Sequence, residues 1–297
     1  MEQEQAKSPI VEGLQGMAVA LSLECSRCGY ELRGMLADTN CPECGEPIRL
    51  TIIESIDPAA RRLSPIQFPK RVGNSITAVV AAYLLSALLA ITALLIHAPV
   101  ISLPHVLQSI PAKPLVLASA CFGLLAFVAL LPMISMYSHK ELVGCRGGLS
   151  LTSTGLLVWS GSMFLAYMVL FVQSNQSGPM AMLFDTCLPA ITAGIVFSGF
   201  KKLVPRLGLR SRAFRQAQGS RQRMNDLLVA LVFVLIGRAL IIASPGDTNL
   251  AMFGLIVMIM SLSLIVFGLG YLLRNTIWIR QALVAPPPAL SDLLHIK

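Results

Sequence analysis

The sequence predicts an all-α polytopic membrane protein, a bundle of about six transmembrane helices preceded by a small N-terminal module. Composition is the first reason. Hydrophobic residues make up 55% of the 297-residue chain and charged residues only 13%, with a mean hydropathy of +0.72. A soluble globular domain carries about 25% charged residues. The second reason is that six apolar stretches follow the N-terminal module, each near the ~20 residues that cross a ~30 Å hydrocarbon core.

The N-terminal module is predicted from four cysteines that stand in two pairs. Cys25 and Cys28 form one Cys-x2-Cys hook, and Cys41 and Cys44 form another after an intervening loop of twelve residues. Two such hooks can present four thiolates to one tetrahedral Zn²⁺ ion. We therefore predict a structural zinc ribbon with these four cysteines as ligands.

A glycine follows each hook, at Gly29 and Gly45. Glycine tolerates a positive φ, which lets the turn close tightly and directs backbone N–H groups at the sulfurs. The segment has no long apolar run from which to build a core, so its fold needs a further stabilising cross-link such as a bound metal ion. Metal binding by such peptides contributes on the order of 10–16 kcal/mol, which is folding energy. Four thiolates leave a negative charge on the zinc complex, which Arg27 and Arg33 could offset.

Three other interpretations of the four cysteines exist. Two disulfides would need an oxidising compartment, whereas the charge distribution described below places the module in the cytoplasm. A catalytic zinc needs an open coordination position, which four cysteines do not leave. A rubredoxin-like iron site also uses paired Cys-x2-Cys hooks, but its hooks usually stand much further apart. Zinc is favoured, and iron remains open.

The string CSRCGYELRGMLADTNCPECGEPI resembles a zinc-ribbon segment at the N-terminus of many uncharacterised bacterial membrane proteins of planctomycete type. Their pattern is C-x-x-C-G-Y-[DE]-L-R-G followed by C-P-E-C-G. The matching residues are Cys25, Cys28, Gly29, Tyr30, Leu32, Arg33, Gly34, Cys41, Pro42, Glu43, Cys44 and Gly45. The resemblance implies zinc and a bacterial membrane protein. It covers only this string and implies no activity.

The chain is divided here into a flexible tail, the ribbon, a linker, the transmembrane domain and a cytoplasmic tail. These parts are predicted at 1–21, 22–53, 54–74, 75–273 and 274–297. Residues 51–53 are expected to complete a small strand pair with the ribbon. The six spans are predicted at about 75–97, 115–137, 151–172, 180–200, 227–244 and 250–273.

Basic residues predict the orientation of the spans. Eight Lys and Arg residues precede the first span, whereas the loops near 98–114, 173–179 and 245–249 together hold only Lys113. Cytoplasmic loops carry the excess of Lys and Arg. Both termini and the ribbon are therefore predicted in the cytoplasm. The resemblance implies that the membrane is a bacterial inner membrane.

The loop near 201–226 carries eight more basic residues. They are Lys201, Lys202, Arg206, Arg210, Arg212, Arg215, Arg221 and Arg223. Two interpretations stay open: an amphipathic helix on anionic lipid, or a solvated loop whose charges enforce topology. The bilayer accounts for the net charge of +8, so a nucleic-acid partner is not expected.

Two charged residues fall inside predicted spans, where charge is costly and usually paired or functional. Asp185 lies about five residues inside the outer end of span four, and Arg238 about six residues inside that of span five. At 1.5 Å per residue, both sit roughly 8–9 Å below the outer surface. We predict a buried salt bridge between them. It either joins two helices structurally or belongs to a substrate or proton site.

The sequence favours a non-enzymatic function. It contains no P-loop, G-x-S-x-G, H-E-x-x-H or G-x-G-x-x-G motif, which weakens an enzymatic interpretation without excluding one. The favoured function is a membrane protein whose cytoplasmic structural zinc ribbon serves assembly or binds a protein partner. The alternative is a small transporter or channel with a polar site around Asp185 and Arg238, which predicts a cavity that reaches Asp185. A lipid-modifying enzyme ranks third.

Overall fold

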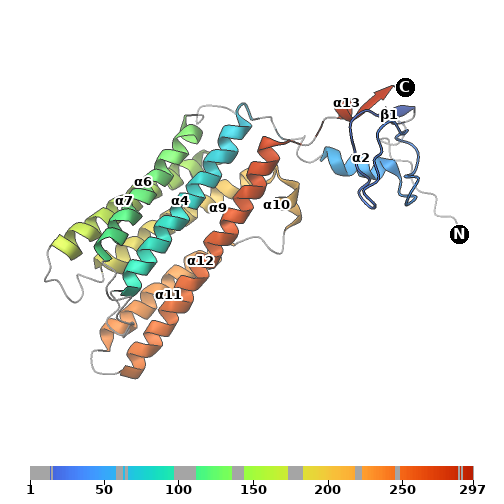
Figure 1. Cartoon of the computed structure of the whole chain (residues 1–297). Helices are drawn as coiled ribbons and strands as arrows, with labels where there is room; N and C mark the ends of the chain where they lie inside the picture. Colours follow the sequence, from blue (N-terminus) through green and yellow to red (C-terminus); the bar gives the residue numbers. More distant parts are fainter. Residues whose placement is uncertain are drawn as a thin grey trace. The chain divides into compact units, whose positions relative to one another are not determined.

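The computed structural model describes residues 14, 16–57, 63, 66–96, 112–135, 144–172, 183–217, 223–244, 248–286, 288 and 290–296. The chain forms two compact units (Figure 1). The small unit comprises Met1–Pro65 and Ala285–Lys297, and the helical unit comprises Ile66–Val284.

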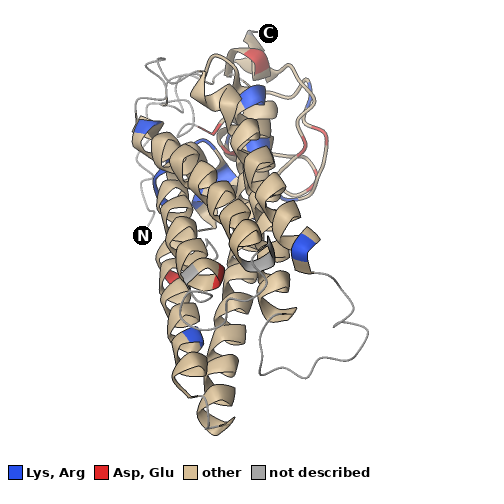
Figure 2. Ribbon diagram, turned by 90° about the vertical axis from the view of Figure 1, so that its left-hand side faces the viewer, with Lys and Arg blue, Asp and Glu red and all other residues tan. Residues whose placement is uncertain are grey.

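The helical unit confirms the predicted all-α class. Six of its described helices are long and apolar enough to cross a membrane. They are α4 (Pro69–Ile96), α6 (Ala112–Ile134), α7 (Arg146–Val172), α9 (Leu188–Gly208), α11 (Met224–Ala243) and α12 (Thr248–Val284). A short π-helical segment, η2 (Leu183–Cys187), leads into α9. Figure 2 shows that charged residues are sparse along the lengths of these helices.

The six helices form a ring in which each contacts the next one along the chain. The first and last helices, α4 and α12, also pack against each other and close the ring. Buried residues from all six helices belong to one hydrophobic core cluster. The interior of the unit is therefore shared by all six helices.

Two helices extend beyond their predicted ends. α12 continues to Val284 and α9 to Gly208, although the spans were predicted to end at 273 and 200. In α9 the buried Leu203, Val204 and Leu207 carry the apolar stripe onward at helical spacing. The helix thus takes in the first part of the predicted basic loop.

Small residues let neighbouring helices approach closely. A Cβ added at Gly199 of α9 would lie 2.4 Å from the Thr152 hydroxyl and 2.7 Å from its backbone nitrogen on α7. A Cβ at Gly237 of α11 would lie 2.6 Å from the carbonyl oxygen of Gly254 on α12. Such contacts are typical of membrane helix interfaces, where close packing replaces the hydrophobic effect.

A buried hydroxyl network joins α4, α6 and α7. The Ser86 hydroxyl donates to the Ser119 carbonyl at 2.7 Å, and the Ser119 hydroxyl donates back to the Ser86 carbonyl at 2.9 Å. The Trp159 indole donates to the Ser86 hydroxyl at 2.8 Å. These bonds satisfy polar groups that would be costly unpaired in an apolar interior.

The small unit draws on both ends of the chain. Strand β1 (Met17–Val19) pairs antiparallel with β2 (Leu294–Ile296), which follows the short helix α13 (Leu290–Leu293). Its only longer described helix is α2 (Ile48–Ile56). If the long helices span a bilayer, this pairing requires an even number of crossings between β1 and β2, which six helices satisfy.

The structure of this unit differs from or adds to the sequence-based expectations at three places. Residues 51–53, expected as strand, lie in α2, because Ile48, Ile52 and Ile56 recur at a spacing of four and are buried together. β1 lies in the segment expected to be a flexible tail. The segment 290–296, expected as a cytoplasmic tail, is part of the unit's fold.

Candidate metal centre and charged cavity

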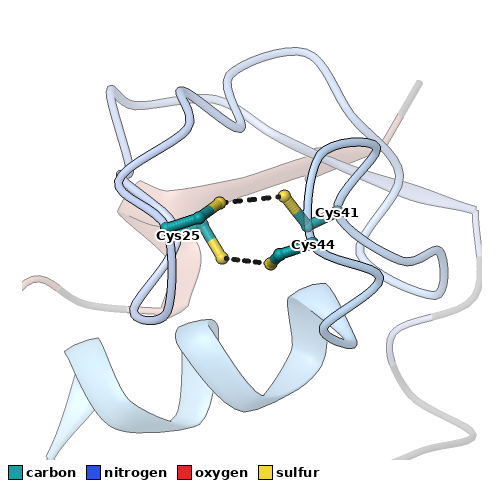
Figure 3. Close-up of side chains that lie close together, drawn as sticks. Cys25, Cys41 and Cys44 are labelled. Atoms are coloured by element: carbon teal, nitrogen blue, oxygen red, sulfur yellow. Dashed lines mark hydrogen bonds between the residues drawn. The ribbon is translucent and has the colours of Figure 1, made fainter.

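The four cysteine sulfurs of the small unit converge on one point. All four Sγ atoms lie within 4.8 Å of one another, with Cys25–Cys44 and Cys28–Cys41 separations of 3.6 Å (Figure 3). Zinc–sulfur bonds of ~2.3 Å in a tetrahedron place the sulfurs roughly 3.8 Å apart. A disulfide needs about 2.05 Å, and all four thiols are free. The sulfurs are therefore spaced for a single tetrahedral ion and not for disulfide bonds.

The two hooks have the same backbone geometry. In each, the first cysteine's N–H donates to the carbonyl five residues on, Cys25 to Tyr30 and Cys41 to Glu46, both at 2.8 Å. Gly29 and Gly45 adopt φ of 76° and 72°, as expected for glycines that close such turns. Two equivalent turns thus face each other across the sulfurs.

Backbone N–H groups favour thiolate at Cys25, whereas burial and the neighbouring cysteine sulfurs raise the pKa of Cys28. The N–H groups of Arg27 and Cys28 point at the Cys25 sulfur and lower the pKa of that thiol to about 6. Metal ions bind the thiolate, so this arrangement prepares a ligand. Four sulfurs around one ion would complete a tetrahedral shell and leave no position for a substrate.

Polar contacts hold the hooks in place. Arg27 and Glu46 form an exposed salt bridge of 3.3 Å that links the first hook to the second. Helix α2 supports the first hook, since the Ser26 N–H donates to the Thr51 hydroxyl at 3.3 Å. Because Glu46 already engages Arg27, this guanidinium offsets the charge of a thiolate complex less than the sequence suggested.

The segment 290–296 supplies core residues that sequence reasoning missed. Leu293 and Leu294 are 1% and 6% exposed and pack in the same cluster as Cys25, Cys41 and Ile52. The Ala20 N–H also donates to the Leu293 carbonyl at 2.7 Å. The adjacent Leu293 and Leu294 were the available signal, but nothing local assigns them a partner far away in sequence.

In the helical unit, the structure brings Asp185 and Arg238 together. The Arg238 Nη2 donates to Asp185 Oδ2 at 2.5 Å, and the Thr186 hydroxyl donates to Oδ1 at 2.6 Å. The two side chains are 15% and 8% exposed. Asp185 lies in the first turn of η2, and the residues before Leu183 are outside the described part.

The ion pair borders a cavity of about 290 Å³ inside the ring of helices. All six helices contribute to its wall, among them Ala87 of α4, Trp159 of α7, Ala193 of α9 and Leu262 of α12. The charged pair can be recognised in the sequence, but the size and lining of the cavity cannot. They depend on how small residues from separate helices face one another.

The basic residues of 201–223 fall into two groups. Lys201, Lys202 and Arg206 are exposed on the end of α9, and a turn then leads to the short helix α10 (Arg212–Gln216). Buried Phe214 anchors α10 against Gly208, where an added Cβ would meet its ring at 2.3 Å. The described members of the second group are Arg210, Arg212, Arg215 and Arg223, while Arg221 lies outside the described residues.

Fold and site together define a class: a helical, multi-pass membrane-type protein with a four-cysteine site that could bind a metal ion. No family model, no curated protein and no solved structure matches the chain.

Proposed function

We propose that this chain is an integral membrane protein of the bacterial inner membrane whose four-cysteine module holds a structural Zn²⁺ ion for assembly. The observation that carries the proposal is the fold of the small unit. The same core contains Cys25 and Cys41 of the hooks together with Leu293 and Leu294 of the segment 290–296. A metal that folds the hooks therefore also creates the docking surface for this segment. We call this arrangement the clasp.

The choice of zinc is supported by chemistry rather than by geometry alone. Four thiolates in a closed shell suit Zn²⁺, which needs neither a redox partner nor an open position. The short loop between the hooks and the resemblance to bacterial zinc-ribbon segments favour zinc over iron. The basic residues before α4 and those on α9 and α10 favour a cytoplasmic position for the clasp.

A protein partner is a further part of the proposal. Leu50 and Ile53 lie one turn apart on α2 and are 43% and 38% exposed. They form an apolar face on the side of α2 away from the buried isoleucines. This face suits a partner helix or strand.

Chelation tests the clasp. Removal of the metal should unfold the hooks, because binding energy supplies their folding energy. Backbone amides of β1 and β2 should then exchange hydrogen faster in the full-length protein, whereas amides of α7 and α9 should not change. Unchanged protection of β1 and β2 after complete metal removal would contradict the proposal.

The second candidate function is a small transporter or channel, and the cavity beside Asp185 and Arg238 favours it. A transport path must admit water to this cavity. In an Ala190→Cys variant, a membrane-impermeant thiol reagent should label residue 190, which lines the cavity wall and is 8% exposed. Peptide mapping that finds no label there would count against a water-filled path.

A further inference from the structure

The cavity in the ring of helices is apolar except where the charged pair borders it. Aromatic and aliphatic side chains such as Tyr83, Trp159 and Leu262 form most of its wall. A cavity of about 150 Å³ with apolar walls can hold a benzene molecule. The volume here, about 290 Å³, has room for a substituted ring.

Arg238 has more hydrogen-bond donors than the described residues satisfy. A guanidinium carries five N–H donors. Its Nη2 donates to Asp185, while its Nε is buried and has no acceptor among the residues that the structure describes. The residue as a whole is 7% exposed. Nε is itself closed off from the cavity, but Arg238 lines the cavity wall, so its remaining Nη N–H groups are the donors that a ligand acceptor would meet.

Asp185, in contrast, has a hydrogen-bond donor for each of its carboxylate oxygens. Its two carboxylate oxygens accept from Arg238 and from the Thr186 hydroxyl. The pair together has no net charge, so an added anion would leave an uncompensated negative charge in apolar surroundings. A neutral acceptor oxygen satisfies a free N–H without that penalty.

We propose that this cavity binds a neutral, ring-sized apolar molecule that carries a carbonyl-type oxygen, and that the Arg238 guanidinium donates to that oxygen. The ring fills the space between the six helices. Asp185 holds the guanidinium in place and keeps the site neutral. The inference uses the cavity of the second candidate function, but it requires only binding and stands whether or not the ligand crosses the membrane.

The test uses duroquinone, a neutral quinone with all four remaining ring positions methylated, and the fluorescence of Trp159. The chain has two tryptophans, so a Trp278→Phe background leaves Trp159, in the cavity wall, as the reporter. Duroquinone should quench this emission saturably in the detergent-solubilised full-length protein. Quenching that rises only linearly with concentration would overturn the proposal.

Two variants separate the role of Arg238 from a general effect. Arg238→Lys keeps a cation beside Asp185 but loses the planar fork of donors. Its affinity for duroquinone should fall about tenfold or more. Arg206→Lys, the same change at an exposed position on α9, should leave affinity unchanged. Equal affinity in both variants would overturn the assignment of Arg238.

A third comparison does not depend on how a variant folds. Durene has the same methylated ring as duroquinone but lacks both oxygens. An excess of durene should displace duroquinone poorly from the protein with Arg238 intact. Equally effective displacement by durene would show that the cavity binds the ring without a hydrogen bond to its oxygen, and would overturn the proposal. Ala193→Phe, which fills the cavity, should abolish saturable quenching.

Discussion

At the scale of single residues, Gly29 and Gly45 shape the turns that carry the metal ligands. Each adopts a positive φ, and an added Cβ at either would meet no atom within 4 Å. The cost of a side chain there is therefore backbone strain alone, without a clash. The sequence predicted both glycines correctly, because a tight turn after a Cys-x2-Cys pair needs this conformation whatever surrounds it.

Gly45→Ala should weaken metal binding. An L-residue in the left-handed region costs about 1–2 kcal/mol, which corresponds to roughly a tenfold loss of affinity. Competition with a colorimetric chelator measures this. Gly270→Ala, at a position in α12 where a Cβ is also free of contacts, serves as the control and should bind metal like the wild type. A Gly45→Ala protein with unchanged affinity would refute the strain argument.

The Asp185–Arg238 pair was predictable in part. Two charges in apolar stretches on consecutive spans indicate a partnership, and the structure pairs them. The Thr186 hydroxyl on Asp185 was not anticipated, because threonine is common in membrane helices and one more gives no signal.

Removal of one member of the pair should cost more than removal of both. Asp185→Asn or Arg238→Met alone leaves a buried charge unpaired, and breaking such pairs typically costs about 3–5 kcal/mol. The double variant removes both charges and should recover much of the thermal stability in detergent. Additive losses in the double variant would mean that the two side chains do not stabilise each other.

The elements show where periodicity is a reliable guide and where it fails. All six long helices were found, because length and apolarity in a membrane span are dictated by the bilayer. Their ends were less predictable. α9 continues past the first lysines, since exposed basic residues on one face do not end a helix whose other face stays buried. Residues 51–53 of α2 were expected as strand because three residues are too few to show a period.

The interface between α7 and α9 should be intolerant of larger side chains. Gly199→Leu would drive atoms into the backbone of Thr152, which cannot move aside like a flexible side chain. We expect a loss of several kcal/mol in stability, or failure to accumulate folded protein, as for overpacked interiors. At Gly161 on α7, an added Cβ would meet no atom within 4 Å, so Gly161→Leu should be tolerated. Thermal melts of purified protein compare the two, and equal melting temperatures would contradict the close approach.

At the scale of the whole molecule, the chain builds its smaller unit from residues far apart in sequence. Segments before the first long helix and after the last one share one core. This long-range pairing was beyond the sequence, because β1 and β2 are three residues each and neither has a distinctive pattern. The cysteine spacing did predict the metal-binding module, because the four ligands lie close together in sequence.

The metal content of the purified full-length protein, measured beside a Cys41→Ser variant, tests the central claim most directly. Our account predicts one zinc per chain in the wild type. It predicts loss of that zinc in the variant, together with faster hydrogen exchange in β1 and β2. Iron in the wild type, or no metal with β1 and β2 equally protected in both proteins, would contradict the account of a zinc-folded clasp.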